Sequence, residues 1–231
     1  IYFYNYIINK IMNRFLLSGA AATAVTAGYI TCNEPSTNVK SHSIKEKDVN
    51  DELLKKRRIF LNSNIDINNA KKIISQLLAL DSASTEPITL IINSGGGSIT
   101  DGLAIYDTIQ LINSPVHTIC TGRASSMASI ILSAGTKGGR YATEHSRIMI
   151  HCARNSVPDK TSVIDLKILT KELDIKNDIL IGILKRHTDR TEEEIRKDIE
   201  RDNFLTPNCA KEIGLIDNIL LPGDGFPDTK A

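Results

Sequence analysis

Two features of the sequence predict an α/β fold with a mainly parallel sheet. Short, largely apolar runs occupy residues 88–94, 116–120 and 147–151, as in strands that are buried on both faces. Segments with apolar residues at helical spacing separate these runs. Strands that alternate with helices are typical of a parallel sheet covered by helices.

The first 50 residues are predicted to precede the folded domain. Residues 1–11 contain no Met and use amino acids typical of A/T-rich codons, so we interpret them as translated upstream sequence and Met12 as the true start. Residues 15–30 are weakly apolar, and no acidic residue comes between Met12 and their end, which is typical of a targeting leader. This run is short and rich in Ala, Thr and Gly, so a membrane-spanning helix is not expected.

The kind of leader is left open by the residues, because a secretory signal, a mitochondrial presequence and the start of a plastid leader all fit. Residues 33–50 are polar and are predicted to form a flexible arm. The folded domain is therefore expected to span residues 51–231 and to begin near Asp51.

The first part of the domain is expected to contain two helical segments and two strands. Residues 51–58 form a short helix or turn that leads into a strand at 58–63. Helical spacing of apolar residues predicts a helix over 66–80. Asp66 is its expected N-cap, because the carboxylate can accept an orphan backbone N–H. The buried strand 88–94 follows.

The middle of the chain continues this alternation. A helix is predicted at 101–112 and a second buried strand at 116–120. The segment GRASSMASIILSAG, residues 122–135, is interpreted as a turn and then a helix that Gly135 ends. RIMIH at 147–151 is predicted to be a third strand.

The C-terminal part is predicted to be mainly helical. Residues 161–187 form a long helical stretch with two apolar stripes, whereas a surface helix normally has one. The second stripe therefore predicts contact with another element or another subunit. A capping box at 191–194 opens a short helix, and Gly214 ends a last helix at 206–213. The stripes contain Leu166, Leu169, Leu173 and Leu180, and Ile164, Ile168, Ile175 and Ile179.

Composition excludes several classes of function. With 28 basic and 27 acidic residues and no Trp, the chain lacks the charge and the stacking surface for nucleic acid. The four cysteines form no CxxC pair and no HExxH motif occurs, so a metal site is not predicted. Cys32 lies in the leader, and the three cysteines of the domain are interpreted as packed thiols. The glycine loop matches neither the Walker A motif nor GxGxxG.

Three candidate groups lie at the carboxyl ends of apolar strands, where open α/β sheets place their sites. The glycine loop at 95–97 is either a tight turn or it presents the N–H of Gly97 to a developing oxyanion. Ser125 and Ser126 either cap the following helix or provide a nucleophile at its N-terminus.

The third candidate is His151, at the end of the strand 147–151. It is either a hydrogen-bonded structural group or a general base, and His117 is its nearest rival for that role. A Ser–His pair also needs an acid to orient the imidazole. Asp202 is one of many carboxylates, and spacing alone does not select it.

Taken together, these segments resemble the proteolytic subunit of Clp protease, a self-compartmentalised serine peptidase. The resemblance covers about residues 53–220, and its motifs follow the family order. It implies the family's α/β spiral, which is related to the crotonase fold, with residues 161–187 as a protruding handle helix. The motifs are RRIFLNSNID, ISQLLALD, INSGGGSITDGLAIYDTI, TICTGRASSMAS, GTKGGRYATEHSRIMIH and ERDNFLTPNCAKEIGLID.

The resemblance implies which residues carry the chemistry. Ser126 immediately precedes Met, as the family's nucleophile does. His151 ends the MIH segment like the general base, and Asp202 precedes NF like the acid that orients it. The backbone N–H groups that match the family's oxyanion donors are those of Gly97 and Met127.

The resemblance also implies partners and a location. The family stacks two heptameric rings face to face into a tetradecamer, and an AAA+ unfoldase delivers unfolded polypeptides to its chamber. The subunit is expected to bind no cofactor and no metal, since ATP is used by the unfoldase. Neither nucleic acid nor stable membrane insertion of the mature domain is expected. A role in protein quality control in a plastid or the mitochondrial matrix, after removal of the leader, is predicted.

The sequence departs from the family around its expected site. Gly95 replaces the usual Pro, and Ser125 stands where the family usually has Ala. After the base, the family continues with Gln-Pro and a glycine pair, whereas residues 152–160 read CARNSVPDK. Cys152 is expected to be packed or partly exposed close to the site.

Another departure concerns the positions that dock the unfoldase. These are aromatic in the family, but here they are Thr89, Ile91 and Leu111. Docking is therefore expected to be weak or to depend on another subunit.

Two alternative functions follow from these departures and from the fold. One is a non-catalytic structural subunit of a mixed ring. The other is a crotonase-type acyl-CoA enzyme, which would use oxyanion donors from glycine-rich loops but would not need Ser126, His151 and Asp202 together.

Overall fold

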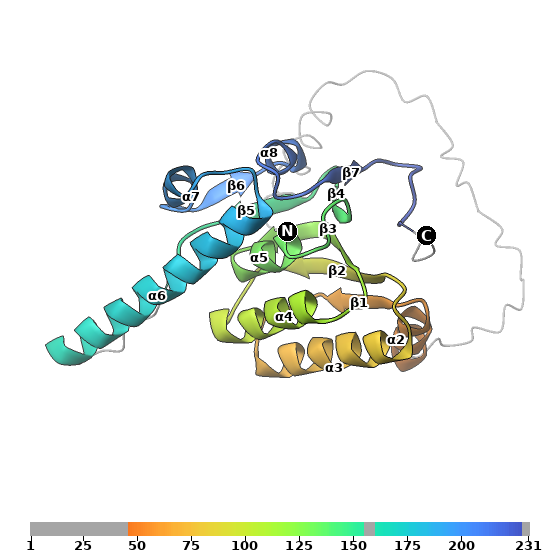
Figure 1. The fold of residues 1–231 in the computed structure, drawn as a ribbon, viewed down its shortest axis with the longest axis horizontal. Coiled ribbons are helices and arrows are strands. Elements are labelled where there is room, and N and C mark those ends of the chain that lie inside the picture. The colour runs from red at the N-terminus through yellow and green to blue at the C-terminus, as the bar shows by residue number, and fades with distance from the viewer. Residues whose placement is uncertain (1–45, 155–159, 228–231) are drawn as a thin grey trace, which may run out of the picture. The chain divides into compact units, whose positions relative to one another are not determined.

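The computed structural model describes residues 46–154 and 160–227, which form one mainly parallel sheet with helices around it (Figure 1). The expected leader with its start at Met12, and most of the expected arm, lie outside the described residues. The strands are β1 (Arg58–Leu61), β2 (Ile88–Ser94), β3 (Val116–Ser125), β4 (Arg140–Thr143), β5 (Arg147–Ile150), β6 (Asn203–Leu205) and β7 (Asn218–Leu220). The helices are α2 (Glu46–Lys55), α3 (Ile67–Ala83), α4 (Ile99–Leu111), α5 (Met127–Ser133), α6 (Val163–His187), α7 (Glu192–Asp198) and α8 (Pro207–Glu212).

The strand order is β1-β2-β3-β4-β7, with β5 beside the end of β3 and β6 beside β5. All pairs are parallel except β5–β6, which is antiparallel. The long strand β3 first pairs with β2 and β4, and its last residues pair with β5, where Ser125 stands opposite Met149. The carboxyl ends of β3 and β5 therefore lie side by side, which is the arrangement that the predicted site requires.

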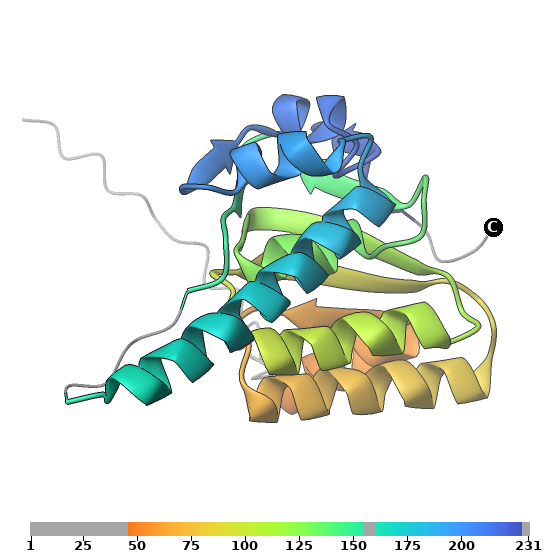
Figure 2. The ribbon, with the colours of Figure 1, turned by 60° about the vertical axis from the view of Figure 1, so that its left-hand side comes forward.

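Helices α3 and α4 run next to each other along one side of β1 and β2 (Figure 2). Their buried faces and the strands form a core of aliphatic side chains, and Ile88, Leu90 and Ile92 of β2 are fully buried. Helix α6 begins away from this core and its last turns pack onto it, since Leu180, Ile181 and Leu184 are buried. Its first turns, 163–168, are exposed.

Several helix caps and stops that the sequence predicts are present in the structure. The Asp66 carboxylate accepts the Asn69 N–H at 2.9 Å and caps α3. The capping box of α7 is formed reciprocally by Thr191 and Glu194. Gly214, after α8, has a φ of 75°, the left-handed conformation that suits a helix stop.

The structure also differs from the expectation in several elements. Helix α2 begins at Glu46, ahead of the expected start of the domain, and β3 continues to Ser125 instead of ending at Cys120. Gly135 is not left-handed; it is next to Thr118, whose side chain would collide with a Cβ there. The short strands β4, β6 and β7 were not expected, because three or four residues carry too little periodicity to be recognised.

A buried ion pair joins the first residue of β4 to the residue that precedes β7. The Arg140 guanidinium donates to both carboxylate oxygens of Asp217, at 2.9 and 2.6 Å, and to the His187 carbonyl at the end of α6 at 2.6 Å. Burial alone would raise the pKa of Asp217, but hydrogen bonds from Arg140 and from the Gly138 N–H lower that pKa below its usual value. The pair thus fixes the last strand against the body of the sheet.

Within the described part of the chain, no helix is both long enough and apolar enough to cross a membrane.

Candidate active site

Ser126 occupies a sharp turn between β3 and α5. Its φ of 56° and ψ of −128° lie outside the regions that residues with a Cβ normally adopt. The turn is held by the Ser126 N–H, which donates to the Met149 carbonyl at 2.8 Å, and by its carbonyl, which accepts the Ser129 N–H and hydroxyl. Its own hydroxyl makes no capping bond to α5. Ser126 is thus the N-cap residue of α5 by position, but its side chain does not cap the helix, and its Oγ is available to a partner.

That partner is His151, the first residue after β5. The distance between His151 Nε2 and Ser126 Oγ is 2.8 Å. On the other side of the ring, Nδ1 lies 3.0 Å from Asp202 Oδ1. The carboxylate suits the tautomer with the proton on Nδ1, which leaves the Nε2 lone pair facing the Ser126 hydroxyl.

Sheet pairing brings these three side chains together. Parallel pairing of β3 with β5 places Ser126 beside His151. Antiparallel pairing of β5 with β6 sets Ile150 opposite Asn203, so Asp202 lies beside His151. Residues that are up to 76 positions apart in the chain (126 to 202) thus form one hydrogen-bonded row.

The glycine loop between β2 and α4 approaches this row closely. Gly97, with a φ of 150°, forms an isolated parallel bridge with Ile65. In that bridge the Ile65 N–H donates to the Gly96 carbonyl and the Ser98 N–H donates to the Ile65 carbonyl, both at 2.9 Å. The Gly97 N–H itself points away from Ile65, because the N–H groups of successive residues in a strand point to opposite sides.

Met127 is the first residue of α5, where backbone N–H groups have no intrahelical acceptor. Both Gly97 and Met127 line the same cavity as Ser126 and His151. Two backbone donors and a hydroxyl that faces an imidazole therefore border one space.

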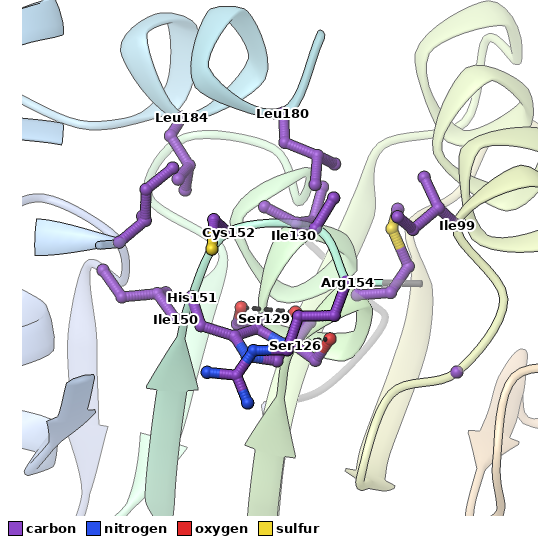
Figure 3. Close-up of a pocket in the computed structure, with 14 residues that line it drawn as sticks. Ile99, Ser126, Ser129, Ile130, Ile150, His151, Cys152, Arg154, Leu180 and Leu184 are labelled. Atoms are coloured by element: carbon purple, nitrogen blue, oxygen red, sulfur yellow. Dashed lines mark hydrogen bonds between the residues drawn. The ribbon is translucent and has the colours of Figure 1, made fainter. Parts of the chain in front are cut away.

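This cavity has a volume of about 210 Å³ and is mostly apolar (Figure 3). Ser126 and His151 lie at its floor, at the strand ends, while Leu180 and Leu184 of α6 close it from above and Ile99 borders its side. The space next to the serine is therefore suited to an apolar group. The remaining lining residues are Gly97, Met127, Ser129, Ile130, Ile150, Cys152, Ala153, Arg154 and Ile199.

The other histidines do not lie at this site. His117 is near the start of β3 beside Tyr141, and burial lowers its pKa. His187 ends α6, where burial and then the charges of Arg140 and Arg186 lower its pKa to about 4. His145 is exposed, and His42 lies outside the described residues.

Sequence reasoning missed one charged residue of the site. Arg154 Nη2 lies 2.5 Å from Asp202 Oδ1, the oxygen that His151 also contacts. Arg154 belongs to the segment where the sequence departs from the family pattern. This departure was the only feature of the sequence that could have pointed to a role for it. Cys152 is half-buried and lines the cavity, as predicted. Residues 155–159 of that segment lie outside the described residues.

Comparison with known proteins shows the family to which the chain belongs. Residues 41–222 match the Clp protease family. The chain belongs to the Clp protease family. Over 173 residues it is 43% identical to the ATP-dependent Clp protease proteolytic subunit of Carsonella ruddii, covering 75% of this chain and 88% of the relative. The same description and identity apply to a Deinococcus radiodurans protein over 174 residues, 75% of this chain and 84% of the relative.

Membership of the Clp protease family confirms the predicted resemblance and the predicted α/β fold class. It also makes the chain a member of a family of peptidases. The structure also shows where the residues that differ from the family pattern lie. Among the expected docking positions, Thr89 and Ile91 are buried in this chain, whereas Leu111 is 82% exposed.

Proposed function

We propose that the chain is a serine endopeptidase subunit of an ATP-dependent Clp protease and that it cleaves unfolded polypeptides. The observation that carries the proposal is the continuous row of hydrogen bonds from Ser126 Oγ through His151 to Asp202 at the floor of an apolar cavity. In this proposal Ser126 is the nucleophile, His151 the general base and Asp202 the acid that orients it.

The first half of the reaction is acylation. His151 Nε2 accepts the hydroxyl proton as Ser126 Oγ attacks a peptide carbonyl. The Asp202 carboxylate holds the Nδ1–H and stabilises the imidazolium. The carbonyl oxygen becomes an oxyanion, and the N–H groups of Gly97 and Met127 donate to it. Loss of one such donor costs roughly 10²–10³ in rate.

The second half releases the acyl group. His151 returns the proton to the leaving amine, and the C–N bond breaks to give an acyl-enzyme on Ser126. A water molecule then gives a proton to Nε2 and attacks the ester carbonyl. As this second tetrahedral intermediate collapses, the C–Oγ bond breaks and His151 returns the proton to Ser126 Oγ, which frees the carboxylic acid and restores the serine. The subunit itself supplies every group in these steps, and we assign ATP hydrolysis to a partner unfoldase.

The proposal includes assembly into stacked rings. Helix α6 carries exposed aliphatic side chains at Val163, Ile164 and Ile168, which are 69, 72 and 61% exposed. Apolar surface of this kind on a projecting helix is typical of a surface that another subunit covers. The relatives are named as proteolytic subunits of an ATP-dependent protease, which supports an assembly with a partner that uses ATP. An organellar location remains a prediction from the first 50 residues.

A fluorophosphonate probe tests the proposed chemistry. The purified protein is treated with the probe, and the adduct is located by mass spectrometry. We expect an adduct on Ser126 that is lost in Ser126→Ala and in His151→Ala. Ser125→Ala is the matched control, because the neighbouring hydroxyl has no place in the mechanism and its loss leaves labelling intact. A folded, ring-sized particle without any Ser126 adduct supports the alternative, a non-catalytic structural subunit of a mixed ring.

A further inference from the structure

Asp202 is the least protected member of the proposed triad. Its side chain is 41% exposed, whereas that of His151 is 14% exposed. An exposed carboxylate changes rotamer readily and exchanges its hydrogen bonds with water. A neighbouring group must therefore restrain the Asp202 carboxylate if this carboxylate is to orient the His151 ring.

The described residues offer one group that does this. Hydrogen bonds to the Asp202 carboxylate come from His151 Nδ1 and from Arg154 Nη2 among these residues, and both reach Oδ1. Within the described part of the chain, no backbone N–H donates to this carboxylate. Among the described residues, the Arg154 guanidinium is therefore the cation that contacts the acid, and its own side chain is 53% exposed.

The backbone on the N-terminal side of Arg154 is held on two sides. The Cys152 N–H donates to the Ile199 carbonyl at 2.7 Å, and the Ala153 N–H donates to Asn177 Oδ1 of α6 at 2.7 Å. From this anchored stretch, the Arg154 side chain extends toward Ser126 and His151 along the wall of the cavity (Figure 3).

We propose that Arg154 is a positioning residue for the peptidase reaction, which acts by holding the Asp202 carboxylate against His151. The inference rests on the proposed function of Ser126, His151 and Asp202. Two effects of the guanidinium oppose each other. Its charge offsets part of the stabilisation that Asp202 gives to an imidazolium, but its ion pair keeps Asp202 in the one position from which it contacts Nδ1. The second effect is expected to dominate, because a displaced carboxylate gives no stabilisation at all.

The inference predicts that loss of Arg154 lowers activity but not the stability of the fold. An ion pair this exposed contributes little to folding, so its loss should leave the unfolding temperature nearly unchanged. Misplacement of a catalytic group by about 1 Å lowers turnover by up to roughly 100-fold. Loss of Arg154 is therefore expected to lower kcat by roughly 10- to 100-fold with an unchanged KM for a short uncharged peptide.

The test uses the intact protein and a double-mutant cycle. Arg154→Met removes the charge and keeps much of the side-chain length, Arg154→Gln is a second neutral variant, and Arg154→Lys keeps the charge. Each is measured alone and with Asp202→Asn, for kcat, KM and the rate of Ser126 phosphonylation. Arg196→Met is the matched control, because Arg196 is 51% exposed and pairs with Asp178 and Glu192 away from the cavity.

We expect both neutral variants to lower kcat and the phosphonylation rate, and the lysine variant to recover part of the loss. The effect should disappear when Asp202 is already Asn, because Arg154 then has no carboxylate to hold. The inference is overturned by wild-type rates in both neutral variants, or by an equal loss in the Asp202→Asn background. A change confined to KM also overturns it, because Arg154 then contacts the substrate.

Failure of the proposed function gives a different result. In that case the wild-type protein itself is not labelled at Ser126. A labelled wild type with equally labelled Arg154 variants contradicts the positioning role alone. Particle size and unfolding temperature are recorded for every variant, so a loss of assembly is distinguished from a loss of positioning.

Discussion

Gly96 and Ser126 lie so close together that a Cβ added to Gly96 would come within 2.7 Å of the Ser126 Cβ and 2.6 Å of the Ser125 carbonyl. The φ of Gly96 is 91°, in the left-handed range that favours glycine. Backbone freedom and small size are both required at this position. The loop that bears one proposed oxyanion donor is therefore packed directly on the turn that carries the nucleophile.

Gly96→Ala is expected to lower peptidase activity and the rate of Ser126 phosphonylation by about 100-fold or more, because the new methyl group displaces the nucleophile turn. Gly95→Ala is the matched control: its φ is not left-handed, and its Cβ would meet only the flexible Arg123 guanidinium, at 3.3 Å. Equal activity of the two variants in a peptide-hydrolysis assay would show that the close approach is not needed.

Acidic substitutions on α6 test the proposed assembly surface. Ile164→Glu combined with Ile168→Glu places two carboxylates on exposed apolar positions. We expect ring stacking to fail, so that native mass spectrometry detects particles of half the mass, because burying unpaired charges is costly. Thr170→Glu adds a charge at a position on the same helix that is already polar, and it should leave the particle size unchanged. Full-size particles of the double variant would contradict the proposed role of α6.

The three described cysteines are expected to differ in reactivity. Burial raises the pKa of the Cys120 thiol to about 11, so this residue should resist alkylation in the native protein. Cys209 is exposed, so its interpretation as a packed thiol is wrong, and Cys152 lines the cavity. We expect iodoacetamide to modify Cys209 and Cys152, as located by peptide mapping.

Modification of Cys152 should block peptide hydrolysis, because the added group occupies the cavity beside His151. The variant Cys209→Ser is used so that Cys152 is the reactive thiol among the described cysteines. Full activity after complete modification of Cys152 would mean that this side chain does not border the substrate.

The Arg140–Asp217 pair is expected to be essential for stability. The two side chains are only 4% and 14% exposed, so removal of one partner leaves a charge with little access to water. Arg140→Met and Asp217→Asn should each lower the free energy of unfolding by about 3–5 kcal/mol in urea titrations. For the exposed Arg196→Met, the expected loss is within about 1 kcal/mol. Similar losses in all three variants would argue against a special role of the buried pair.

His187 is expected to make stability depend on acidic pH. Its pKa is lowered to about 4, first by burial and then by Arg140 and Arg186, whereas in the unfolded chain it is about 6.5. The unfolded state therefore binds a proton that the folded state does not, so this contribution is complete above pH 6.5 and is lost as the pH falls toward 4. With allowance for partial exposure, we expect a loss of about 1 kcal/mol between pH 7 and pH 5.

The measurement compares urea unfolding of the wild type, His187→Gln and His145→Gln at these two pH values. His187→Gln should remove the extra loss at pH 5. His145→Gln should keep it, because that side chain is 91% exposed. An unchanged pH dependence in His187→Gln would assign the acid sensitivity to other groups.

Much of the site was accessible from the sequence because its parts lie at strand ends. The carboxyl ends of parallel strands meet at one edge of a sheet, so Ser126 and His151 were expected near each other. Asp202 was different: β6 has only three residues, and without the family resemblance no pattern selected this carboxylate. Arg154 was not recognised at all, because its contact with Asp202 joins residues 48 positions apart.

The residues themselves specify the long elements and their caps. Strand β2 occupies the predicted residues 88–94, and Asp66 caps α3, because a largely apolar run and a capping carboxylate act between near neighbours in the chain. The extension of β3 to Ser125, the left-handed backbone of Ser126 and the shared oxygen of Asp202 arise only when distant segments pack together. Such contacts form only in the assembled sheet, so no short stretch of sequence specifies them by itself.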